Sequence, residues 1–75
     1  MSRYATVLME KRDKNTGKGV VLYEGDDIQG AIDAAEKACN NPKNVGKFIR
    51  QYDYVWPHGG MRDVEIIGPL KITRP

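Results

Sequence analysis

The sequence predicts an α+β domain with the element order ββαββ, in which four antiparallel strands form one sheet and a single helix packs on one face. Two observations lead to this prediction. Four stretches of strand-forming residues are bounded by clusters of turn formers, and one stretch between the second and third carries apolar residues at helical spacing. A chain of 75 residues has the length of one domain, so we assign residues 1–75 to a single unit.

The first two strands are expected to form a hairpin. Residues 3–12 combine apolar, aromatic and β-branched side chains without Gly or Pro, and turn-forming residues 13–17 follow them. Residues 20–24 then have the composition of a second strand. The simplest connection is antiparallel, through a basic loop at about residues 13–18.

The helix is the clearest element. Asp26 and Asp27 suit its N-terminus, where a carboxylate accepts hydrogen bonds from free N–H groups, and Gln29 completes a capping-box spacing with Asp26. Gly30 costs the helix up to about 1 kcal/mol relative to Ala and indicates a close backbone contact. Pro42 cannot continue the helix. The apolar stripe consists mostly of small residues: Ile28, Ala31, Ile32, Ala35, Ala38 and Cys39.

The second hairpin is expected from residues 47–56 and 61–67, separated by turn formers at 57–60. Residues 70–73, after Gly68 and Pro69, have the composition of a short edge strand. Alternation along 47–56 separates two sets of side chains, which are Phe48, Tyr52, Tyr54 and Trp56 on one side and Ile49, Gln51, Asp53 and Val55 on the other.

The aromatic row and Arg50 in it allow three interpretations. The rings form the core under the helix, or they form a protein interface, or they stack on unpaired bases of a nucleic acid. A single helix covers only one side of a four-stranded sheet. We therefore expect the uncovered side to meet another macromolecule.

Catalytic and cofactor motifs are absent from the sequence. The residues around Lys18 do not match a phosphate-binding loop, because the motif needs Gly at position 12 and Ser or Thr at position 19, where this chain has Arg and Gly. His58 is the only imidazole, Cys39 the only thiol, and Ser2 the only serine. Metal sites and nucleophilic triads need several such groups together. We expect no enzymatic activity, no cofactor and no bound metal.

Charge and composition restrict the class of partner. The net charge of +2 and a pI near 8.8 are too low to indicate nucleic-acid binding by themselves. Residues 24–36 hold five acids and no Lys or Arg, so they can dock on a basic surface. With 40% apolar and 29% charged residues and no apolar run of membrane-spanning length, we expect a cytoplasmic protein that does not bind membranes.

The stretch VVLYEGDDIQGAIDAAEKA, preceded by RYATVLMEK and followed by KFIRQYDYVW, resembles the ββαβ pattern of small phage-encoded inhibitors of bacterial RNA polymerase. In outline it is also similar to several small anti-CRISPR proteins. The resemblance covers residues 4–56, and the chain departs from it in its longer basic loop and in a fourth strand ending at Ile72. It implies a small domain without catalysis that binds a large host enzyme and blocks access of nucleic acid or a partner.

These observations combine into one hypothesis and two alternatives. The hypothesis is a phage-type inhibitor in the bacterial cytoplasm, which binds a host protein or ribonucleoprotein complex through Asp26, Asp27, Asp33, Glu36, Tyr52, Tyr54 and Trp56. The first alternative is a single-stranded nucleic-acid-binding module that uses Lys11, Arg12, Lys14, Lys18 and Arg50. The second is a homo-oligomeric structural protein, whose own copy covers the open side of the sheet.

Overall fold

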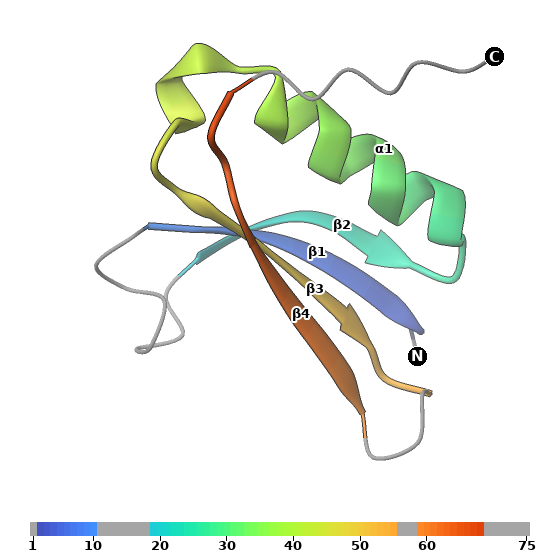
Figure 1. The fold of residues 1–75 in the computed structure, drawn as a ribbon. Coiled ribbons are helices and arrows are strands. Elements are labelled where there is room, and N and C mark those ends of the chain that lie inside the picture. Colours follow the sequence, from blue (N-terminus) through green and yellow to red (C-terminus); the bar gives the residue numbers. More distant parts are fainter. Residues whose placement is uncertain (1, 11–18, 56–58, 69–75) are drawn as a thin grey trace, which may run out of the picture.

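The computed structural model describes residues 2–10, 19–55 and 59–68, and it contains one helix packed on a four-stranded antiparallel sheet (Figure 1). The elements are β1 (Tyr4–Met9), β2 (Gly19–Gly25), α1 (Ile28–Cys39), the short 3-10 helix η2 (Pro42–Asn44), β3 (Phe48–Asp53) and β4 (Gly60–Glu65). The α+β class, the element order ββαββ and the position of the helix on one face are confirmed.

The strand order in the sheet is β2-β1-β3-β4. Both expected hairpins are present, and β1 joins them because it pairs antiparallel with β3 as well as with β2. The pairing of β1 with β2 has an irregular register between Thr6 and Val7, whereas β3 and β4 pair without a shift. As a result β1 and β3 are the central strands, and β2 and β4 form the two edges.

The helix begins one residue later than the capping-box spacing predicts. Asp27 is the N-cap, with an extended backbone, and its carboxylate accepts from the Gln29 N–H at 3.0 Å. Asp26 instead accepts from the Arg3 backbone N–H at 2.8 Å, and the Gln29 amide donates to Asp33 at 2.9 Å. The expected Asp26–Gln29 box is therefore wrong, because Asp26 is used to hold the start of the chain.

The main core lies between α1 and the sheet. Ala38, Ile49 and Ile66 form a buried cluster, and Leu8, Ala35 and Cys39 pack against it. Small side chains let the helix approach the strands closely enough for direct polar contacts. The buried Thr6 hydroxyl donates to the Ala31 carbonyl oxygen at 3.0 Å, and the Gln51 amide donates to the same oxygen at 3.4 Å.

Gly30 is in close contact with Tyr23 of β2. A Cβ at position 30 would lie 2.5 Å from Cε1 of the Tyr23 ring, so only glycine fits beside this ring. The Tyr23 hydroxyl also accepts from the Asp27 N–H at 3.1 Å. From the sequence, a close approach to another backbone was expected at Gly30. The structure shows instead a contact with the Tyr23 side chain.

The third strand is shorter than the expected stretch of residues 47–56. It ends at Asp53, whose carboxylate accepts from the Val55 N–H at 3.1 Å and so turns the backbone away from the sheet. The expected basic loop and the expected edge strand at 70–73 lie outside the described residues. Within the described part of the chain, no helix has the length and apolar character needed to span a membrane.

Candidate functional site

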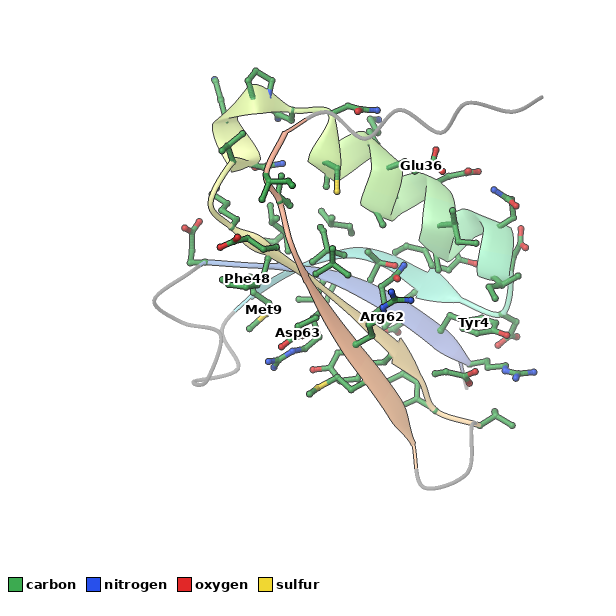
Figure 2. The ribbon with its side chains drawn as sticks, in the orientation of Figure 1. Tyr4, Met9, Glu36, Phe48, Arg62 and Asp63 are labelled. Atoms are coloured by element: carbon green, nitrogen blue, oxygen red, sulfur yellow. The ribbon has the colours of Figure 1, made fainter. Side chains whose placement is uncertain are left out.

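The sheet has one face that no described element covers, and we call it the open face. Thr6 and Ile49 point toward α1, so their neighbours along β1 and β3 point away from it. The registers extend this face across the other two strands. It comprises Ala5, Val7, Met9, Val21, Glu24, Phe48, Arg50, Tyr52, Met61, Asp63 and Glu65. Figure 2 shows Met9, Phe48 and Asp63 on the side of the sheet opposite α1.

Phe48 and Tyr52, the members of the aromatic row within β3, lie on the open face and not under the helix. Ile49, the neighbour of Phe48, occupies the core position instead, at 2% exposure. The interpretation of these rings as the core beneath α1 is therefore wrong. The physical reason is the alternation itself, because the aliphatic residue of β3 fills the space under the small-residue helix and places its aromatic neighbours outside.

Tyr52 and Tyr54 form a stacked pair at the end of β3. Their ring centroids are 5.5 Å apart and the ring planes differ by 5°. Tyr54 is 56% exposed although it is a large side chain. A stacked pair that is held in place and remains accessible offers a rigid aromatic surface to a partner.

The centre of the open face contains an ion pair between β3 and β4. The Arg50 Nε and Nη2 atoms donate to the two carboxylate oxygens of Asp63 at 2.8 and 3.0 Å. The hydrogen bond to Asp63, and then one to Tyr52, raises the pKa of Arg50 above its usual value. Arg50 is thus fixed by a carboxylate, which makes it a poor ligand for phosphate groups.

Apolar side chains surround this ion pair. Met61 and Val21 are 57% and 58% exposed, whereas Ala5 and Met9 are buried although α1 does not cover them. Ala5 lies opposite Tyr52 in the pairing of β1 with β3, and Met9 lies opposite Phe48. The open face therefore combines packed and exposed apolar side chains with a central ion pair and with Glu24 and Glu65, and exposed apolar side chains that lie together are typical of an interaction site.

Three of the four acidic residues of the expected partner site hold local structure. Asp26 holds the Arg3 backbone, Asp27 caps α1, and Asp33 accepts from Gln29. Glu36 lies on the outer side of α1 (Figure 2). It lines a shallow depression together with Asp33 and the basic Lys37. Asp27, Asp33 and Glu36 thus belong to the helix side, whereas Tyr52 lies on the open face. Asp26 is nearer to the aromatic pair, because the Arg3 N–H donates to Asp26 and the Tyr54 N–H donates to the Arg3 carbonyl oxygen, both at 2.8 Å.

Several expected site residues lie outside the described part of the chain. These are Trp56 of the aromatic row and the four basic residues Lys11, Arg12, Lys14 and Lys18. Of the expected nucleic-acid-binding set, the described residues contain only Arg50.

Three further residues of the open face, Met61, Val21 and Asp63, were not predicted from the sequence. Met61 lies opposite Tyr52, and Asp63 lies opposite Arg50, in the pairing of β3 with β4. The signal available in the sequence was the complementary charge of Arg50 and Asp63, because opposite charges favour directly facing positions of an antiparallel pair.

Metal ligands and thiol chemistry add nothing to this site. Among residues 2–10, 19–55 and 59–68, no three His, Cys, Asp or Glu side chains are grouped as a metal ion requires. Cys39 is half-buried in α1, and burial, followed by the charge of Glu36, raises the pKa of its thiol. A raised pKa keeps the thiol protonated and unreactive near neutral pH.

Comparisons with known proteins do not assign the chain to a family. No family model matches it, and no curated protein and no solved structure is significantly similar to it.

Proposed function

We propose that this protein is a non-enzymatic interaction domain that binds a partner protein through the open face. The observation that carries the proposal is the stacked Tyr52–Tyr54 pair, which stands beside exposed Met61 on a face that no described element covers. Tyrosine is enriched among the residues that dominate binding energy at protein interfaces, since its ring buries a large area and has few rotamers to lose.

The ion pair at the centre of the face suits such an interface. A charge that enters an interface without a partner costs several kcal/mol, which disfavours binding. Arg50 and Asp63 already neutralise each other across β3 and β4. A partner can therefore cover the centre of this face without burying an unpaired charge of Arg50 or Asp63.

A protein partner fits the face better than a nucleic acid does. Glu24 and Glu65 share the open face, and their carboxylates repel phosphates. Arg50 is held by Asp63. The resemblance to phage-encoded inhibitors extends the proposal to a bacterial complex that processes nucleic acid, which the protein would inhibit by blocking access to it.

Affinity capture from bacterial lysate with paired variants tests the proposal. Wild type is compared with Tyr54→Glu and Met61→Glu, which place a charge on the open face, and with Asp33→Lys/Glu36→Lys on the outer side of α1. We expect one host complex to be retained by wild type and lost with the two open-face variants, provided that circular dichroism shows them to be folded. Equal retention by these variants contradicts the proposal, and loss with the helix variant alone assigns the binding to the acids.

The two alternatives give different results in solution. Fluorescence anisotropy with a random single-stranded oligonucleotide, at two salt concentrations, detects nucleic-acid binding through its steep decrease with salt. Light scattering detects a homo-oligomer. We expect no oligonucleotide binding at low salt and a monomeric mass. A salt-sensitive complex or a dimer that the Tyr54→Glu change dissociates would replace the proposed partner by nucleic acid or by a second copy.

A further inference from the structure

A groove lies on the helix side of the sheet, between α1 and the edge strand β4. The helix packs mainly on β1 and β2, so it leaves the helix side of β4 uncovered (Figure 1). The groove has a volume of about 580 Å³, and its lining includes Ile28, Ile32, Gln51, Asp53 and Arg62. On its helix wall Ile28 is 56% exposed, although it belongs to the apolar stripe of α1.

β4 is an edge strand of the sheet, and one of its two sides is unpaired among the described residues. Among the described residues β4 pairs only with β3, and its pairing register has no bulge. Natural proteins protect such edges with proline, with charged side chains, lysine above all, or with a bulge. The sequence of β4, GMRDVE, carries the charged residues Arg62, Asp63 and Glu65 but has neither proline nor lysine. Alternate N–H and C=O groups along β4 are therefore available to another strand.

Arg62 gives the groove its charge preference. Arg62 faces Gln51 in the pairing of β3 with β4, and Gln51 donates to the Ala31 carbonyl, so both side chains are on the helix side. Figure 2 shows Arg62 between the sheet and α1. No described residue forms a hydrogen bond or ion pair with the Arg62 guanidinium, whereas Asp53 in the same groove is bound by Arg3 at 3.1 Å. Among the described residues that line the groove, Arg62 is thus the available cation, and Ile28 and Ile32 make the helix wall apolar.

We propose that β4 and this groove bind an extended acidic segment of a partner protein by strand addition. The segment pairs its backbone with the free edge of β4 and extends the sheet to five strands. Its helix-side residues alternate, so that apolar side chains contact Ile28, Ile32 and Val64 and a carboxylate pairs with Arg62. In this binding mode main-chain hydrogen bonds provide affinity and alternate side chains provide specificity. The site is separate from Tyr54 and goes beyond the proposed role of the open face.

A capped peptide, Thr-Val-Thr-Glu-Thr-Ile-Thr, is the probe for the side-chain part of the proposal. Titrated into the full 75-residue chain, it is expected to shift the amide NMR signals of β4 and those of Ile28 and Ile32. Arg62→Glu should weaken binding at least about tenfold, and a peptide with Lys in place of Glu should recover binding to that variant. Lys37→Glu, the same charge change on the outer side of α1, should leave the affinity unchanged. Absence of binding, or equal losses for Arg62→Glu and Lys37→Glu, overturns the proposal.

Two N-methylated forms of the peptide test the backbone part without changing the protein. Methyl groups on alternate residues block one edge of the peptide strand or the other. One form should lose binding and the other should retain it, because only one edge pairs with β4. Equal binding by the two forms overturns strand addition.

The same spectra identify other occupants of the β4 edge. Shifts of β4 signals that depend on protein concentration without peptide indicate a second copy, and contacts from β4 to residues 69–75 indicate the chain's own end. Either result overturns the proposed partner segment. Tyr54→Glu should leave peptide binding intact, so a failure of the open-face proposal is distinguishable from a failure of this one.

Discussion

The Arg50 guanidinium spans from β3 to the Asp63 carboxylate of β4 and makes two hydrogen bonds, at 2.8 and 3.0 Å, on the face opposite the helix. The Arg50 side chain is only 11% exposed, and that of Asp63 is 25% exposed. The pair links an edge strand to a central strand where α1 provides no cover. It is therefore both a part of the open face and a support for β4.

The first prediction concerns this pair. Arg50→Met should lower the free energy of unfolding by more than the lost packing of the Arg50 side chain explains, because it leaves the Asp63 carboxylate partly buried without its cation. A double-mutant cycle with Asp63→Leu, measured by urea unfolding, should give a coupling free energy of about 1 kcal/mol. Additive effects of the two changes would show that the pair contributes no mutual stabilisation. Arg3 and Asp53, a more exposed pair, provide a comparison for which we expect a smaller coupling.

A second prediction follows from the contact between Gly30 and Tyr23. Ala is the better helix former by about 1 kcal/mol, yet Gly30→Ala should destabilise this protein, because its new Cβ would lie 2.5 Å from the Tyr23 ring. Forcing an extra methyl group into a packed contact typically costs about 1–3 kcal/mol. The free energy of unfolding in urea measures the net change.

The control for this prediction removes the ring. In a Tyr23→Ala background, Gly30→Ala should become stabilising, since only the helix propensity then remains. The same sign in both backgrounds would contradict the steric explanation. The Tyr23→Ala change alone is measured as the reference, because it also removes the hydroxyl that accepts from the Asp27 N–H.

The third prediction separates the observed cap from the one expected at Asp26 and Gln29. Asp27→Ala should lower the free energy of unfolding by about 1 kcal/mol, whereas Asp27→Ser should retain most of it, because serine also accepts from the first turn. Gln29→Ala should change stability by less than about 0.5 kcal/mol, since the Gln29 side chain contacts Asp33 and not the cap. A loss at Gln29 equal to that at Asp27 would instead support a capping box.

Local signals in the sequence were sufficient for the elements and for both hairpins. The turn formers after residue 24 and the helical spacing of Ala31 and Ala38 are signals that can be recognised from residues close together in the sequence. The face of β3 that meets the helix was not predictable in this way. Alternation separates Phe48 from Ile49 but does not decide which side α1 covers, and that depends on Thr6 and Ile66, far away in sequence.

The candidate site could be predicted only in part, and the reason is the same. Tyr52 and Tyr54 were identified from their own strand, whereas Met61 and Asp63 join them only through the register of β3 with β4. The exposure of Ile28 depends on the strand order, because β4 lies at the sheet edge beyond the reach of α1. Helical spacing placed Ile28 on the apolar stripe of α1 but does not show that this end of the stripe is exposed.

The last prediction concerns pH and Cys39. Burial in α1, and then the charge of Glu36, raises the pKa of this thiol above the ordinary value of 9.0. Between the pKa of the unfolded thiol and that of the folded thiol, the folded protein binds more protons, so stability decreases as pH rises through this range. The stabilisation that the raised pKa of Cys39 provides is fully present below pH 9.0. Urea unfolding at pH 7, 9 and 10 should therefore show a free energy of unfolding that decreases above pH 9.0, and the decrease should be smaller in Cys39→Ala.

Alkylation of Cys39 by iodoacetamide provides an independent measurement of this pKa, because only the thiolate reacts. Its rate in the folded protein should reach half its maximum at a higher pH than in urea-unfolded chain, and coinciding profiles would show that folding does not shift this pKa.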